Sequence, residues 1–187
     1  MGRDKPLKNE YQAAMPRNAV GRTALLGVTL ALALGTYALE SALPPIVPAL
    51  PGARLGLSNV FVLFTLCALG PWAGLLLTLG KCLVGPLLAG SASGIPYSLA
   101  GGVLAWGAMR LGLRYGSRFL GLVGVSVLGA ACHAAGQVLV SVWVTGTPQV
   151  LSYLPLLTGL SSVTGVFVGL CAFWLWRGYF RWSRARL

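Results

Sequence analysis

The sequence predicts an all-α integral membrane protein with about six transmembrane helices and both termini in the cytoplasm. Three observations lead to this prediction. The 187-residue chain is 56% hydrophobic and only 9% charged, whereas a soluble domain carries about 25% charged residues. Its mean hydropathy is +0.78. Its apolar runs are separated by basic or proline- and glycine-rich stretches, as in membrane helices joined by short loops.

The basic residues form three clusters, each beside an apolar run. They are Arg3, Lys5, Lys8, Arg17 and Arg22, then Arg110, Arg114 and Arg118, then Arg177, Arg181, Arg184 and Arg186. Six crossings that start from a cytoplasmic N-terminus place all three clusters on the cytoplasmic side, and only Arg54 falls in an outer loop. The net charge of +11 therefore indicates topology and contact with anionic lipids, and nucleic acid is not an expected partner.

The chain divides into three parts. Residues 1–22 form a polar, basic cytoplasmic segment, which has no pattern of a cleavable signal peptide. Residues 23–176 form a six-helix membrane domain, and residues 177–187 form a basic cytoplasmic tail.

The first helix is predicted over about 23–43, and it carries small residues at a spacing of four. These are Thr23, Gly27, Ala31 and Gly35. Such a spacing lets another helix approach closely. The approaching helix either belongs to the same chain or comes from a partner protein that docks on this face.

A proline-rich segment, PPIVPALPGARLG, follows over residues 44–56. Its four prolines remove backbone donors and fix φ, so a regular helix is excluded. The segment is too apolar for an ordinary exposed loop. We therefore expect a structured outer cap or a re-entrant segment, since non-helical backbone at membrane depth must be buried in protein or line a cavity.

Five further helices are predicted, over about 57–69, 72–88, 97–111, 119–144 and 151–176. The second opens with Ser58 and Asn59, both of which are good N-cap residues. A tight turn at Gly70–Pro71 separates it from the third. Loops are expected at 89–96, 110–118 and 145–149.

Six polar side chains fall in the outer half of the bilayer when residues are counted along these helices. They are Glu40, Asn59, Lys81, Ser98, His133 and Gln137. Lys81 is too central to reach the membrane surface at about 1.5 Å per residue, so it needs a partner or a ligand. Convergent polar groups in apolar surroundings are typical of a small-molecule site, and ionisable residues in membranes mark functional sites.

Structural roles are the alternative for the same residues. Glu40 is either half of an ion pair with Arg54 or Lys81, or a ligand contact or proton-linked switch. His133 and Gln137 lie one helical turn apart. They either make an inter-helix hydrogen bond, worth about 0.6 kcal/mol on average, or line a binding cavity.

The sequence indicates no catalytic residue, metal site or cofactor. The three acids are scattered at Asp4, Glu10 and Glu40, and there is no phosphate-binding loop. The four cysteines, Cys67, Cys82, Cys132 and Cys171, lie singly in apolar runs, which excludes a paired metal or disulfide framework. His133 and Glu40 could join a Ser-His-acid arrangement, but no nucleophile motif accompanies them.

Several segments together resemble the Gx transporter family, also known as heptaprenyl diphosphate synthase component I. They are PGARLGLSNVFVLF, GVSVLGAACHAAGQVLV and YLPLLTGLSSVTGVFVGL, with Glu-x-x-x-Pro-Pro at 40–45, and the resemblance covers about residues 24–176. The family is similar to the S components of energy-coupling-factor transporters, which are six-helix binders of vitamins and metabolites. Two positions depart from its pattern. Ala134 stands where the family has Asn, and Lys81 stands near a family Arg, which loses a bidentate donor.

The resemblance implies a membrane transport protein, an S-component-like subunit for uptake of a small metabolite such as a vitamin or an isoprenoid or quinone precursor. Its implied partners are the small-molecule substrate, a transmembrane coupling protein and ATPase subunits, in a bacterial plasma membrane. The alternative is a non-catalytic membrane accessory subunit of a prenyl diphosphate synthase. The synthase reaction itself needs carboxylate clusters that hold Mg²⁺, which three scattered acids do not supply.

Overall fold

The computed structural model describes residues 18–43, 54–116 and 120–184, and these residues are helical almost throughout. The predicted proline-rich cap lies largely outside them, as does most of the N-terminal segment. The α-helices are α2 (Ala19–Ser41), α3 (Asn59–Ala68), α4 (Pro71–Leu88), α5 (Ile95–Tyr115), α6 (Leu122–Thr145) and α7 (Leu154–Arg184). Two short 3₁₀ helices precede α5 and α7, η1 (Ala92–Gly94) and η2 (Pro148–Tyr153).

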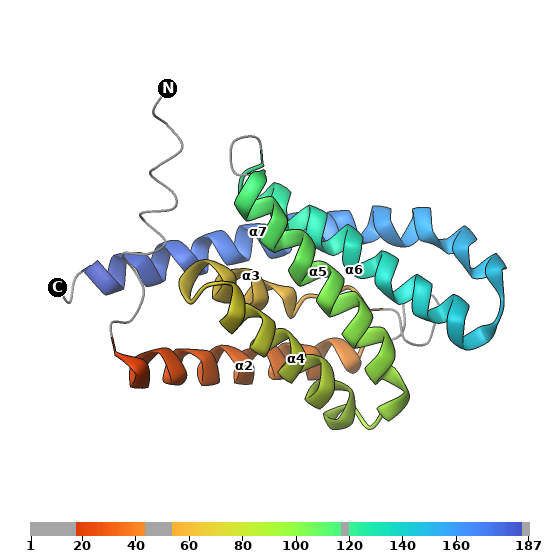
Figure 1. Ribbon diagram of the computed structural model, residues 1–187, viewed down its shortest axis with the longest axis horizontal. Coiled ribbons are helices and arrows are strands. Elements are labelled where there is room, and N and C mark those ends of the chain that lie inside the picture. Colours follow the sequence, from red (N-terminus) through yellow and green to blue (C-terminus); the bar gives the residue numbers. More distant parts are fainter. Residues whose placement is uncertain (1–17, 44–53, 117–119, 185–187) are drawn as a thin grey trace.

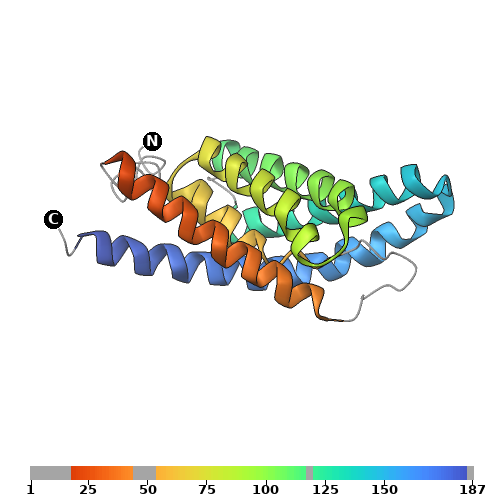
Figure 2. The same cartoon turned by 90° about the horizontal axis from the view of Figure 1, so that it is seen from below.

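Successive helices run in alternating directions through one elongated bundle (Figures 1 and 2). The start of α2 and the end of α7 lie at one end, and the turn between α6 and α7 lies at the other. We call the first end the basic end, because five arginines lie toward it. They are Arg22 near the start of α2, Arg110 and Arg114 near the end of α5, and Arg177 and Arg181 near the end of α7.

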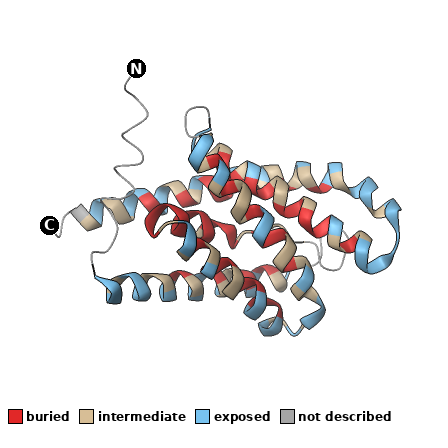
Figure 3. Cartoon of the chain, viewed as in Figure 1, coloured by how far each residue is buried: buried red, intermediate tan, exposed pale blue. Residues whose placement is uncertain are grey.

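α3 is the centre of the bundle. It contacts α2, α4, α5 and α7, and all of its residues except Phe61 are buried (Figure 3). Its apolar side chains pack with Leu77, Met109 and Val168 in one core. Ten residues are about 15 Å long, half of the roughly 30 Å hydrocarbon core of a bilayer. The chain enters α3 through the non-helical residues 54–58, of which Gly56 and Ser58 are buried.

Four helical segments among the described residues are long and apolar enough to cross a membrane. They are Ala19–Ser41, Pro71–Leu88, Leu122–Thr145 and Pro148–Ser183. Together they make the chain a multi-pass membrane protein. α5 has 21 residues, but Arg110 and Arg114 lower the hydropathy of its last turns. Six crossings and cytoplasmic termini remain predictions.

The helices extend beyond several predicted limits. α2 begins four residues early because the Asn18 side chain accepts a hydrogen bond from the Gly21 N–H at 3.2 Å and caps it. α5 continues through Arg114, which therefore lies on a helix and not in a loop. α7 continues to Arg184, past the predicted end at 176. α4 matches its prediction closely, with Pro71 in its first turn.

A buried polar cluster as the candidate functional site

The structure brings the predicted polar residues together around the short stretch of backbone that leads into α3. We call the assembly the polar cluster. Its members are Glu40, Arg54, Gly56, Ser58, Asn59, Lys81, His133 and Gln137. The six predicted site residues are all buried, Lys81 with only 2% of its surface exposed.

The backbone of residues 54–57 is the hub of this cluster. The N–H groups of Gly56 and Leu57 donate to the two carboxylate oxygens of Glu40, at 2.8 and 3.2 Å. The Arg54 N–H donates to Oε1 of Gln137 at 3.1 Å. These residues precede a helix and have no helical partners of their own, and buried backbone donors must be paired. Side chains of α2 and α6 therefore accept the hydrogen bonds of these N–H groups.

Gly56 is the tightest point of the cluster. Its φ is +75°, a conformation that glycine adopts without steric cost. A Cβ at this position would lie 2.8 Å from Nδ2 of Asn59 and 3.1 Å from Cδ2 of His133. The missing side chain therefore allows α3 and α6 to bring these two residues to one point.

Lys81 reaches α3 from the middle of α4. Its Nζ donates to Oγ of Ser58 at 2.9 Å and to Oδ1 of Asn59 at 2.6 Å. Ser58 occupies the N-cap position of α3, as expected, but its side chain makes no cap bond there. Its hydroxyl instead accepts a hydrogen bond from the buried Lys81. Ser58 was not predicted as a site residue, but its position directly before Asn59 could have indicated it.

Of the two roles considered for Glu40, the ion pair with Arg54 or Lys81 is not formed among the described residues. Its two oxygens accept hydrogen bonds from backbone N–H groups instead. The Arg54 guanidinium lies 4.2 Å from the centre of the Tyr37 ring and donates to Oγ of Ser41. Tyr37 lies about one turn before Glu40 and Ser41 directly follows it, so both contacts of Arg54 come from residues close to Glu40 in the sequence.

His133 and Gln137, which their spacing placed on one helix face, are hydrogen-bonded to each other within α6. Oε1 of Gln137 accepts from Arg54, so its Nε2 is the donor to Nε2 of His133, at 3.0 Å. This chain of bonds assigns the imidazole proton to Nδ1. Nδ1 lies against Gly101 of α5, where an added Cβ would be 2.9 Å away. It has no hydrogen-bond partner of ordinary geometry among the described residues.

Two further predicted positions adjoin the cluster. Ser98 of α5 is buried, and its carbonyl accepts a hydrogen bond from the Cys82 thiol at 3.0 Å, next to Lys81. Ala134 is the position at which the resemblance led us to expect an asparagine. It is buried in a small apolar group with Val138 and Leu157. An asparagine side chain at this position would point toward Leu157 of α7 and not toward the backbone of residues 54–57.

The small residues of α2 lie on an open face. Thr23, Gly27, Ala31 and Gly35 are all exposed. A Cβ added at Gly27 or Gly35 would meet no atom within 4 Å. The described part of the chain therefore leaves this face uncovered, and docking of a partner on it remains a prediction. No group of three metal-ligating side chains occurs within the described residues.

The fold and the site together define a multi-pass, all-helical membrane protein with a polar cluster inside its bundle. Residues 29–175 match the family model described as heptaprenyl diphosphate synthase component I. The match covers well over half of the chain. The chain therefore belongs to this family, and the resemblance drawn from its motifs is confirmed. Searches of curated proteins and of solved structures gave no match.

Proposed function

We propose that this chain is the substrate-binding subunit of a membrane transport system that takes up a small metabolite. The polar cluster carries the proposal. Side chains from α2, α3, α4 and α6 meet non-helical backbone inside an apolar bundle. Ionisable groups at that depth are costly and mark substrate or ion pathways, and non-helical backbone there is tolerated where protein or a cavity surrounds it.

The charges of the cluster favour an anionic substrate. Arg54 and Lys81 contribute two positive charges, and Glu40 contributes one negative charge whose oxygens already accept two backbone N–H groups. An ammonium has three N–H donors, and Lys81 uses two of them. A metabolite with a carboxylate or phosphate group would neutralise the remaining positive charge and accept a hydrogen bond from the third N–H of Lys81. An acidic vitamin or an isoprenoid or quinone precursor is such a metabolite.

In this proposal the chain itself is not an enzyme. ATP hydrolysis comes from separate subunits, and a transmembrane coupling protein docks on the exposed small residues of α2 in a bacterial plasma membrane. The open face at Gly27 and Gly35 supports the docking step, because small residues let helices approach closely in a membrane.

A non-catalytic accessory subunit of a prenyl diphosphate synthase is the second candidate. The description of the family as a synthase component favours it. In that case the exposed arginines of the basic end would hold a soluble catalytic subunit.

Affinity purification of the full chain from membranes of the source cell separates the two candidates. We expect an ATPase and a second membrane protein to co-purify, and Gly27→Leu to reduce their recovery. Gly107→Leu on α5 is the matched control, since a Cβ there also meets no atom within 4 Å. Recovery of a soluble prenyltransferase in place of an ATPase, unaffected by Gly27→Leu, would contradict the transport proposal.

A further inference from the structure

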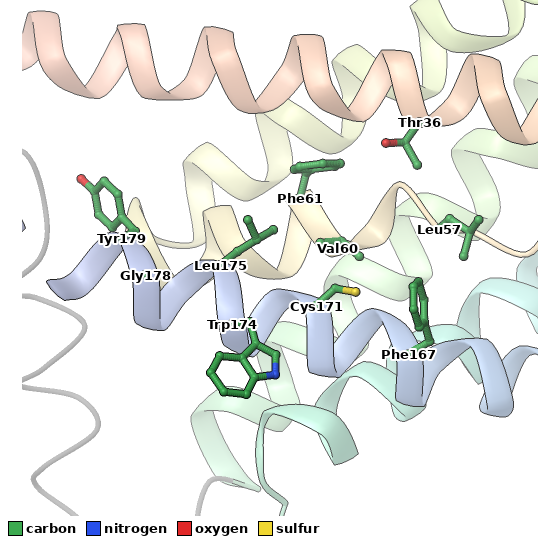
Figure 4. Close-up of a pocket in the computed structure, with 10 residues that line it drawn as sticks. All are labelled: Thr36, Leu57, Val60, Phe61, Phe167, Cys171, Trp174, Leu175, Gly178 and Tyr179. Atoms are coloured by element: carbon green, nitrogen blue, oxygen red, sulfur yellow. The ribbon is translucent and has the colours of Figure 1, made fainter. Parts of the chain in front are cut away.

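A lateral groove of about 790 Å³ runs along α7, between α7, α3 and α2. Figure 4 shows Phe167 at one end of the groove and Gly178 and Tyr179 at the other, with Cys171 between them. Most of its lining side chains are apolar, among them Phe61 of α3. The groove is open at the side of the bundle, where the membrane would contact it.

The length of the groove matches one leaflet of the bilayer. From Phe167 to Tyr179 α7 advances about 18 Å at 1.5 Å per residue. One leaflet of the bilayer core is about 15 Å thick, half of the full 30 Å. The groove is therefore long enough to receive an acyl chain that spans one leaflet.

The groove also has a charged end. Gly178 and Tyr179 lie toward the basic end of the bundle. Arg177 adjoins them, and Arg181 follows Gly178 by three residues, so it continues the same face of α7. Both arginines are exposed. Guanidinium groups bind phosphate oxygens in a bidentate manner, and basic residues at a membrane surface attract anionic lipids.

We propose that the groove is a binding site for an anionic phospholipid. Its acyl chain lies along Phe167, Cys171 and Gly178, and its phosphate lies between Arg177 and Arg181. The site is distinct from the polar cluster, and this inference does not depend on the proposed transport function.

The native cysteines provide a direct test. Cys171 lines the groove, whereas Cys132 of α6 is also half-buried but is not among the residues that line the groove. The full chain is purified in mild detergent, delipidated, and titrated with phosphatidylglycerol or phosphatidylcholine of the same acyl chains. Peptide mass spectrometry follows alkylation of both thiols by N-ethylmaleimide.

We expect phosphatidylglycerol to slow alkylation of Cys171 and to leave Cys132 unchanged. The same protection of Cys171 should need about 30-fold more phosphatidylcholine, because two arginines attract the net negative charge of phosphatidylglycerol. The double variant Arg177→Gln/Arg181→Gln should remove this preference between the lipids. Equal protection of Cys171 by both lipids in the native chain would overturn the proposal.

A second pair of variants tests the groove itself. Gly178→Leu fills it, and Gly159→Leu on the same helix is the control, because an added Cβ meets no atom within 4 Å at either position. Native mass spectrometry should show phosphatidylglycerol retained by Gly159→Leu and lost from Gly178→Leu. Equal retention by the two variants would overturn the proposal. Protection of Cys171 only in preparations that contain a co-purified membrane protein would also overturn it, in favour of a docking helix.

Discussion

Gly56 is the residue on which the geometry of the polar cluster depends most directly. Its N–H holds Glu40, and its missing side chain leaves the space where Asn59 and His133 meet. Both features come from the one residue type that adopts a φ of +75° without steric cost.

Gly56→Ala should destabilise the protein more than the same change at a matched position. Gly146 also has a positive φ, +63°, but an added Cβ there meets nothing within 4 Å. Backbone strain of about 1–2 kcal/mol is common to both variants. Overpacking against Asn59 and His133 should add about 1–3 kcal/mol at Gly56 only.

Unfolding of both glycine variants in a titration with sodium dodecyl sulfate measures this difference. Equal losses of stability at Gly56 and Gly146 would show that the contacts with Asn59 and His133 are dispensable.

Glu40→Gln tests the double hydrogen bond of the carboxylate. An amide offers one oxygen, so one of the two backbone N–H groups at Gly56 and Leu57 would face an NH₂ group. Leaving a buried donor unpaired costs about 1–3 kcal/mol, which thermal unfolding in detergent can detect. Ser126→Ala is the control, because the buried Ser126 hydroxyl has no hydrogen-bond partner in the described ranges. A control loss as large as that of Glu40→Gln would refute the assigned role.

Part of this site could be predicted from the sequence. Helical spacing alone placed His133 beside Gln137, and counting residues along helices placed Lys81 and Asn59 in the same half of the bilayer. The partners of Glu40 could not be predicted, because they are backbone N–H groups and any residue type provides them. Electrostatics suggested an ion pair, but a non-helical entry to α3 supplied closer donors.

At the scale of elements, α5 and α6 are held together by close backbone contact. A Cβ at Gly136 of α6 would lie 2.8 Å from the carbonyl oxygen of Ala100 on α5. Gly101 in turn leaves room for the His133 ring. This contact presses the histidine against the adjacent helix and so positions it in the polar cluster.

Gly136→Ala should force the two helices apart, since backbone atoms cannot yield as a side chain can. The overpacking cost of about 1–3 kcal/mol should exceed the gain of about 1 kcal/mol from replacing a helical glycine. Gly107→Ala on α5, which meets no atom within 4 Å, should show that gain alone. Opposite signs of the two stability changes are expected in the same unfolding assay. A stabilising Gly136→Ala would rule out the close contact.

The existence of the helices could be predicted better than their ends. Gly70–Pro71 fixed the start of α4, because a proline is favoured in the first turn of a helix. The end of α7 was predicted too early, since its last eight residues look like a basic tail by composition. The structure keeps them helical, and aromatic residues recur among them, with Tyr179 packed edge-on against Phe64 of α3 at 5.7 Å.

At the scale of the whole molecule, the described arginines other than Arg54 gather toward the basic end, while Ser93 and Thr147 lie in the connections at the other ends of the helices. The positive-inside rule predicts that the basic end lies in the cytoplasm. In a cysteine-free background, Ser93→Cys and Thr147→Cys should react with a membrane-impermeant maleimide on intact cells. Ser183→Cys should react only after the cells are opened. Labelling of Ser183→Cys on intact cells would reverse the orientation.

The content of the polar cluster tests the central claim most directly. The protein is purified gently, and the small molecules that it retains are extracted and quantified by mass spectrometry per mole of protein. We predict one anionic metabolite in near-stoichiometric amount in the native chain and in Ser126→Ala, and its loss from Lys81→Met. An absence of any such metabolite from the native chain, or equal retention by Lys81→Met, would contradict the account.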